Sequence, residues 1–236
     1  MGTGAASRAF QAPEHALSLS PALDAVLPDG GLAWGQVSEL CVAQPSYATS
    51  VSLLACARAQ NEGLPATGAS STREGPWCAF VDPFGSLYAP GVAQAGVNLE
   101  RLLVVRPSLQ ALPRIVVRLV EARAFALVVV DTFSPVARPI TKGTTQVDLA
   151  KWVDLAKWTN VVRRLNTAVA NTHSAVLLLT DKNAPRPLPL PVALRLELSC
   201  TEPGVLKARV AKEKHGRVAL PHNIDCRDLV PVAGGS

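Results

Sequence analysis

Short apolar runs alternate with longer amphipathic stretches along most of the chain. The apolar runs predict strands at Val37–Val42, Trp77–Val81, Leu102–Val105, Ala126–Asp131 and Ala175–Thr180. The stretches between them predict helices at Ser46–Gln60, Tyr88–Ala95, Gln110–Ala122 and Asp148–Asn171. Each helix is long enough to connect two parallel strands. The alternation therefore predicts an α/β fold that is doubly wound around a mostly parallel central sheet.

The pattern changes after Thr180. Prolines recur at every second position from Pro185 to Pro191, which excludes a helix or a central strand there. Beyond them, Leu194–Thr201 and Leu206–Lys214 alternate apolar with polar residues around a Pro-Gly turn, which predicts an antiparallel C-terminal hairpin. We expect one domain, with a flexible N-terminal segment at residues 1–16, a core at 17–224 and a C-terminal tail at 225–236.

Composition narrows the class of protein without fixing its function. The 236 residues are 48% hydrophobic and 17% charged, which suits one sizeable core. The net charge of +5 would suit a polyanionic partner but does not require one. The chain has five cysteines and no Cys-x-x-Cys pair, which favours buried free thiols in a reducing cytosol. No apolar run approaches the ~20 residues of a membrane helix, so we expect a cytoplasmic protein without membrane contact.

No metal or nucleophile motif stands out. The four histidines, His15, His173, His215 and His222, are scattered and have no carboxylate or cysteine at metal-ligand spacing. No Gly-x-Ser-x-Gly motif is present. The sequence therefore predicts neither a metal site nor a catalytic nucleophile.

Several segments, in order and at matching spacing, resemble the RecA core. The resemblance runs from about Leu17 to Asn223 and implies a RecA-like fold. It rests on Ser18-Leu19-Ser20, Leu23-Asp24, Gly30–Gly35, Glu39-Leu40, Cys78–Asp82, Gly96-Val97, Val128–Thr132, Leu177–Thr180, Arg195-Leu196-Glu197 and Lys212-Glu213-Lys214.

The same resemblance places the phosphate-binding loop at Val42–Ser50, where its chemistry is missing. Such a loop needs glycines to wrap phosphates, a lysine to neutralise charge and a Ser or Thr for magnesium. Tyr47 stands in place of a glycine and Ala48 in place of the lysine, whereas Thr49 and Ser50 keep their hydroxyls. We therefore expect no bound cofactor.

Two further positions that the resemblance marks as catalytic also differ. Phe84 stands where RecA has its water-activating glutamate, and it cannot accept a proton. Lys182 stands where RecA has the amide that senses the γ-phosphate. Asp131 matches the metal-associated aspartate, and we expect it mainly to end a strand with hydrogen bonds to a neighbouring turn. The chain is predicted not to be an enzyme.

Within the RecA-related proteins, the chain resembles the ImuA group. This resemblance implies a scaffold role in the SOS response, in the DNA-damage-induced translesion synthesis complex. The implied partners are a Y-family-polymerase-like protein of the ImuB type, an error-prone C-family polymerase and RecA itself, with a homo-oligomer as a further option. Two alternatives stay open: a cell-division inhibitor like SulA, and a nucleotide-independent module that binds DNA weakly and without sequence preference.

Two kinds of residue are candidates for contacts with DNA or a partner protein. The first are basic residues, and the second are apolar residues at the edge of a predicted helix face or near the chain end. The basic candidates for DNA or interface contacts are Arg163, Arg164, Arg186, Lys207, Arg209, Lys212 and Lys214. The apolar candidates for partner contacts are Trp152, Trp158, Leu229, Val230 and Val232. The two tryptophans lie at the two edges of the apolar face of a predicted helix. Each is therefore expected either to pack at the edge of the core or to contact a partner protein. The last three lie near the chain end, which we expect to have no role in the core.

Overall fold

The computed structural model describes residues 16–43, 45–62, 75–132, 155–182 and 190–229. Their centre is an eight-stranded sheet in the order β10-β9-β8-β3-β7-β6-β4-β5. Its strands are β3 (Val37–Val42), β4 (Trp77–Val81), β5 (Leu102–Val105), β6 (Phe125–Asp131), β7 (Ala175–Asp181), β8 (Leu194–Glu202), β9 (Val205–Glu213) and β10 (His222–Asp225). The pairs from β8 to β5 are all parallel, whereas β8, β9 and β10 pair antiparallel. The predicted α/β fold with a mostly parallel sheet and a C-terminal hairpin is confirmed.

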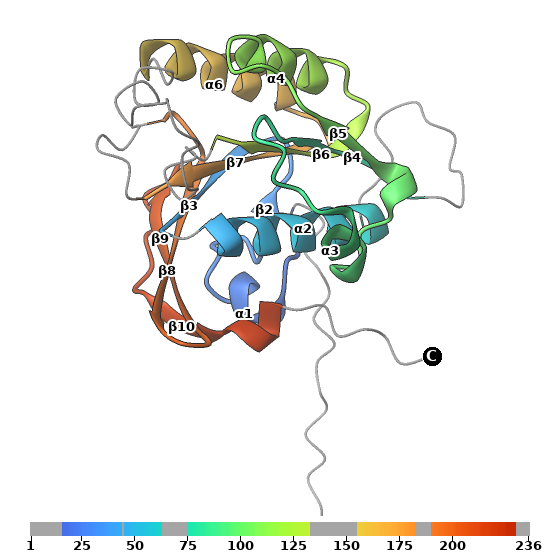
Figure 1. Cartoon of the computed structure of the whole chain (residues 1–236). Coiled ribbons are helices and arrows are strands. Elements are labelled where there is room, and N and C mark those ends of the chain that lie inside the picture. The colour runs from blue at the N-terminus through green and yellow to red at the C-terminus, as the bar shows by residue number, and fades with distance from the viewer. Residues whose placement is uncertain (1–15, 44, 63–74, 133–154, 183–189, 230–236) are drawn as a thin grey trace, which may run out of the picture.

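Helices cover both faces of this sheet (Figure 1). One face carries α4 (Leu112–Glu121) and α6 (Leu155–Val169), and the other carries α1 (Pro21–Asp24), α2 (Pro45–Glu62) and α3 (Ala89–Gln94). Two short 3-10 helices, η1 (Leu99–Arg101) and η3 (Cys226–Leu229), and the two-stranded pair of β1 (Ala16–Leu17) and β2 (Leu32–Ala33) complete the described parts.

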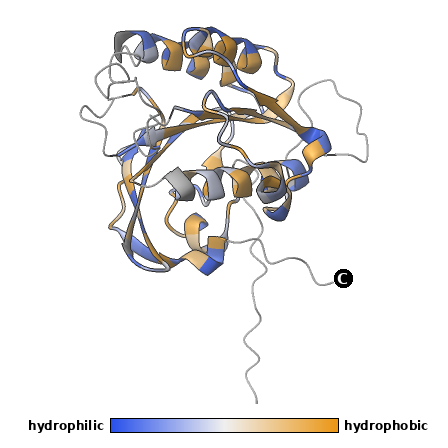
Figure 2. Ribbon diagram, viewed as in Figure 1, coloured by the Kyte–Doolittle hydropathy of each residue, from blue (hydrophilic) through white to orange (hydrophobic). Residues whose placement is uncertain are grey.

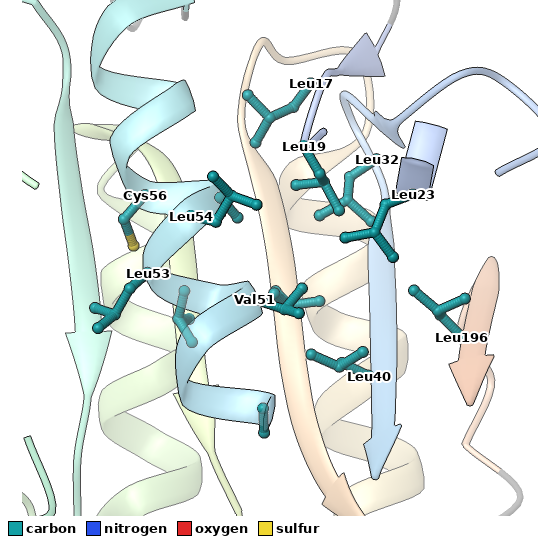
Figure 3. Packing of buried hydrophobic residues seen from close by; sticks show 14 of the residues in the cluster. Leu17, Leu19, Leu23, Leu32, Leu40, Val51, Leu53, Leu54, Cys56 and Leu196 are labelled. Carbon is teal, nitrogen blue, oxygen red and sulfur yellow. The ribbon is translucent and has the colours of Figure 1, made fainter. Parts of the chain in front are cut away.

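Each face of the sheet has its own apolar cluster, because side chains of a strand alternate between faces. On the α2 side, Leu40 of β3 and Leu196 of β8 face Val51 and Leu54 of the helix (Figure 3). On the other side, α4 and α6 pack on side chains such as Val130 of β6. Figure 2 shows that hydrophobic residues line the strands and the helix faces turned toward them. Burial on both faces explains why the central strands are continuous apolar runs.

The segment around α1 depends on one buried carboxylate. Asp24 accepts hydrogen bonds from the Ser18 hydroxyl at 2.6 Å and from the Leu19 backbone N–H at 2.8 Å. Ser20 caps the helix by accepting from the Leu23 N–H at 3.3 Å. Burial raises the pKa of the Asp24 carboxyl. The serines and the aspartate of the RecA-like opening thus hold the local fold together.

One glycine of the opening block is required by a close backbone approach. A Cβ built on Gly31 would lie 2.3 Å from the carbonyl oxygen of Leu17. Leu17 pairs with Leu32 in the β1–β2 ladder, so any larger residue at position 31 would push β1 away. Gly31 therefore has a steric role in this structure.

The C-terminal residues correct the expected tail boundary. Asp225 belongs to β10, which pairs with β9, and Ile224 and Leu229 are both buried in the α2-side cluster. The prediction that the chain end has no role in the core is wrong for Leu229, because η3 packs on α1 and α2. Residues 230–236, with Val230 and Val232, lie outside the described residues.

Candidate functional site

The carboxyl ends of four parallel strands meet at one edge of the sheet. β3 ends at Val42, β4 at Val81, β6 at Asp131 and β7 at Asp181. Because parallel strands place these ends together, the loops that follow share one region, and ligands of open α/β sheets bind there. The residues predicted for the nucleotide site follow or end these strands.

Helix α2 begins unusually close to the end of β3. Only two residues separate Val42 from Pro45, the first residue of the helix. In a phosphate-binding loop, a longer non-helical segment precedes the helix and aims its N–H groups at the ligand. Tyr47 and Ala48, which align with that loop, instead lie in the first turns of α2.

The side chain of Ala48 points into the core. It is 1% exposed and belongs to the α2-side cluster together with Val51. Thr49 is partly buried and Ser50 is exposed, and both take part in further interactions. A lysine in place of Ala48 would start from a position among apolar side chains.

Tyr47 links the start of α2 to the C-terminal hairpin. A side-chain hydrogen bond with Cys200 raises the pKa of Tyr47 to about 12. A second contact joins its hydroxyl to Cys226, whose pKa is raised chiefly by burial. The Cys226 N–H in turn donates to the Gly204 carbonyl at 2.8 Å, in the turn between β8 and β9. The tyrosine therefore occupies the space between α2 and this turn.

Asp82, directly after β4, organises the neighbouring loop. Its carboxylate is fully buried and accepts from the Ser86 N–H at 2.8 Å, the Ser86 hydroxyl at 3.0 Å and the Leu87 N–H at 3.1 Å. The Arg106 Nε lies 3.5 Å from the same carboxylate. This network fixes a tight loop that contains Phe84, which is partly buried.

Asp131 connects to the same loop. It is buried at the end of β6 and accepts a long hydrogen bond of 3.4 Å from the Ser86 hydroxyl, as expected for an aspartate that ends a strand at a neighbouring turn. Asp131 also makes a further interaction. Ser86 thus joins the two carboxylates of the region.

Comparison with known proteins covers the part of the chain that contains these loops. A model of the RecA N-terminal domain matches residues 11–182, which include β3, β4, β6 and β7. The chain belongs to the RecA N-terminal domain family.

Individual relatives agree with this membership. The chain is 31% identical to the RecA protein of Marinobacter nauticus over 137 residues, which is 56% of the chain and 36% of the relative. It is 34% identical to the RecA protein of Streptococcus pyogenes over 137 residues, or 56% and 33% of the two chains. A RecA protein of Streptococcus pneumoniae is 35% identical over 127 residues, or 53% and 29%. The match spans about a third of the length of these RecA proteins.

Lys182, at the end of the family match, turns toward the hairpin. Its Nζ lies 3.3 Å from the Glu197 carboxylate of β8, and its backbone N–H donates to the Val42 carbonyl at 2.8 Å. Lys182, which the resemblance aligns with the γ-phosphate-sensing amide, thus forms an ion pair with β8 of the same sheet.

The basic candidates separate into two groups. Arg163 and Arg164 are exposed on α6, and Arg164 pairs with Glu121 at 2.9 Å. The other described candidates lie in the part of the sheet that bends away from α6 (Figure 1). Lys207, Arg209 and Lys212 lie on β9, and Lys214 directly follows it. Arg186 lies outside the described residues. The structure therefore does not bring the basic candidates together on one surface.

The apolar candidates are also divided. Trp158 is 4% exposed and packs in the cluster under α4 and α6, so the structure favours the core-edge alternative for this residue over a partner contact. Trp158 lies at the edge of the apolar face of α6, and this edge is buried because α4 packs beside α6. Leu229 is likewise buried, whereas Trp152, Val230 and Val232 lie outside the described residues.

Sequence reasoning missed two parts of the region. The only hint of the Asp82 loop was the strand-ending aspartate itself, since Ser86 carries no motif. The contact of Tyr47 with Cys200 joins distant positions and left no signal in the sequence. Within the described ranges, no cluster of three or more metal-ligating side chains occurs, and no helix is long and apolar enough to cross a membrane.

Proposed function

We propose that this chain is a non-catalytic RecA-like accessory protein of the DNA-damage-induced translesion synthesis complex. In this role it binds a Y-family-polymerase-like partner and an error-prone replicative polymerase without using ATP. Family membership supports the RecA-like part of the proposal. The ImuA resemblance supports the choice of partners.

One observation carries the non-catalytic part. Ala48 occupies the position of the phosphate-binding lysine, inside the first turns of α2 and buried in the core. In the part of the chain that the structure describes, α2 starts at Pro45, two residues after β3 ends at Val42. Phe84 adds to this, because an aromatic ring in place of the glutamate cannot activate water. We infer that the region has kept its structural role and lost its chemistry.

For the partner, we propose the free edge of β5. This strand ends the sheet order opposite β10, so its outer backbone groups have no strand partner among the described residues. Leu103 and Val104 are each 38% exposed on it, and Trp77 beside it is 42% exposed under the Arg101 guanidinium. An edge strand with exposed apolar side chains is suited to strand addition by a partner protein.

The test is reconstitution of the full chain with its polymerase-like partner by size-exclusion chromatography, with and without ATP. The account predicts one complex of equal stability in both conditions. It also predicts that Thr49→Ala and Asp131→Asn change the partner affinity by less than about twofold. A complex that forms only with ATP would refute the non-catalytic role.

A paired set of variants tests the proposed edge. Leu103→Glu with Val104→Lys should weaken the complex at least tenfold, about 1.4 kcal/mol. Val218→Lys with Leu220→Glu is the matched control, because these two residues are also exposed and apolar but lie outside the edge. Equal affinity of both double variants would exclude β5 as the docking strand.

A further inference from the structure

Helices α4 and α6 lie side by side on one face of the sheet, and no other described element covers them from outside (Figure 1). Many of their outward positions are basic. The exposed cations come from α4, from the residues just after it and from α6, and we call them the α4–α6 cation face: Arg114, Arg118, Arg123, Lys157, Arg163 and Arg164. The sequences of the two helices contain one acidic residue, Glu121.

The one carboxylate of these helices already binds an arginine of the face. Glu121 Oε1 lies 2.9 Å from Arg164 Nη2, at the surface, and this ion pair joins the end of α4 to α6. Among the described residues, no carboxylate makes an ion pair with Arg114, Arg118 or Arg163. The face therefore carries positive charge that its own helices do not neutralise.

Helix stability does not explain why Arg114 is basic. This residue lies in the first turn of α4, which contains no acidic residue, and Ala111 before the helix provides no side-chain cap. The N-terminal end of a helix is the positive end of its dipole, so a cation is unfavourable there and a carboxylate is favourable. A glutamate would also keep the position soluble. The arginine therefore points to a role outside the helix.

The spacing and surroundings of the arginines fit a peptide better than a nucleic acid. Arg114 and Arg118 stand one helical turn apart, about 6 Å between Cβ atoms, and an arginine can hold a carboxylate through two parallel hydrogen bonds. Ile115 and Leu119 follow them directly and are half-buried, so apolar surface borders the cations. A phosphodiester backbone has no apolar counterpart for this border. Trp158, the one aromatic residue of the two helices, is 4% exposed and offers bases no stacking surface.

We propose that the α4–α6 cation face binds an acidic amphipathic helix of a partner protein. Carboxylates one turn apart on that helix pair with Arg114 and Arg118, and a further carboxylate reaches Arg163 on α6. Apolar side chains beside the carboxylates contact Ile115 and Leu119. This inference does not rest on the polymerase partner, because it concerns a helical face of the sheet and not the edge of β5.

The probe is a labelled synthetic helix with glutamates one turn apart on one side and leucines beside them. Its matched control peptide carries lysines in place of the glutamates. Fluorescence anisotropy measures the binding of each peptide to the full chain at low salt and near physiological salt, because screening weakens exposed ion pairs. The glutamate peptide should bind and should bind more weakly as salt rises, whereas the lysine peptide should not bind.

Two triple variants that remove the same charge test the surface. The test variant is Arg114→Gln, Arg118→Gln and Arg163→Gln, all at exposed positions of α4 and α6. The control variant is Lys207→Gln, Arg209→Gln and Lys214→Gln, at exposed positions on β9 and just after it. Circular dichroism checks that both variants are folded.

The proposal predicts at least tenfold weaker binding of the glutamate peptide to the test variant at low salt. The control variant should stay within about twofold of the unmodified protein, since the β9 charges lie on another part of the sheet. Absence of peptide binding, or an equal loss in both variants, would overturn the proposal. Tighter binding of a single-stranded or duplex oligonucleotide that is lost in the test variant would overturn the assignment to an acidic helix.

A charge-reversed protein makes the test independent of simple loss of binding. Arg114→Glu, Arg118→Glu and Arg163→Glu together should lose the glutamate peptide and gain the lysine peptide. Arg114→Glu alone should raise the thermal unfolding temperature slightly, because a carboxylate suits the first turn of a helix. A charge-reversed protein that is folded but does not bind the lysine peptide would contradict the proposal, and so would a lower unfolding temperature for Arg114→Glu.

Discussion

Arg195 and Glu39 form a bidentate ion pair across the parallel strands β8 and β3. The Arg195 Nε lies 2.7 Å from Glu39 Oε2, and its Nη2 lies 2.8 Å from Oε1. Glu39 is 1% exposed and also accepts from the Thr180 hydroxyl of β7 at 2.6 Å. Two segments of the RecA-like pattern, far apart in the chain, are thus joined in one network that fastens the hairpin to the central sheet.

Arg195→Met is expected to destabilise the protein by about 3 to 5 kcal/mol, because it leaves the buried Glu39 charge without its partner. Urea unfolding at pH 7 measures the loss. Adding Glu39→Gln to this variant removes the unpaired charge and keeps an acceptor for Thr180, so the double variant should recover at least half of the loss. If the double variant is as unstable as Arg195→Met, the charge is not the cause.

Ala48→Lys should not restore nucleotide binding. The side chain starts inside the apolar cluster, so the substitution should cost at least about 1 to 3 kcal/mol from overpacking alone. Thermal unfolding and calorimetry with ATP measure the two effects. A stable variant that gains ATP binding would show that position 48 faces a phosphate site.

Leu229→Ala should destabilise the fold by about 2 to 5 kcal/mol, because η3 buries this residue against α1 and α2. Leu220→Ala is the matched control, since Leu220 is highly exposed, and it should change stability by less than about 0.5 kcal/mol. Equal unfolding midpoints for the two variants would contradict the core role of η3. Truncations that probe the tail for partner binding should therefore begin at Val230.

Acid should weaken the turn after β9 through Glu213. Its carboxylate accepts from the backbone N–H groups of His215 and Arg217 and from the Arg217 guanidinium. The Arg217 guanidinium is the main cause that lowers the pKa of Glu213 to about 2, from an ordinary value of 4.5. Between these values the unfolded chain binds more protons, so the contribution of Glu213 to stability is present above pH 4.5 and is lost as the pH falls toward 2. Glu213→Gln should flatten the dependence of unfolding free energy on pH in this window, and an unchanged slope would refute the assignment.

The sequence predicted the central sheet well because its strands are buried on both faces. β3, β4 and β5 begin and end at the predicted residues, since continuous apolar runs leave little doubt about their ends. The predicted helices lie within a few residues of those observed, and residues 148–154 of the last predicted helix lie outside the described residues. By contrast β1, β2 and α1 are two to four residues long, too short to show any period.

The candidate site was predictable only as a location. The RecA-like pattern indicated which loops surround it, but not that α2 begins at Pro45 or that Tyr47 contacts Cys200, because such contacts depend on the packing of distant segments. Lys212 and Lys214 are both exposed, although β9 ends at Glu213, between them. That Lys212 lies on the same face of β9 as Lys207 and Arg209 depends on a β-bulge at Ala211, and no local motif predicts this bulge.

The central claim is that the RecA-like core of this chain works without nucleotide. Isothermal titration calorimetry of the full chain with ATP and magnesium, up to millimolar nucleotide, tests it most directly. The account predicts no saturable heat of binding and no release of phosphate over hours. A dissociation constant near 1 µM, equivalent to about −8 kcal/mol, would contradict it.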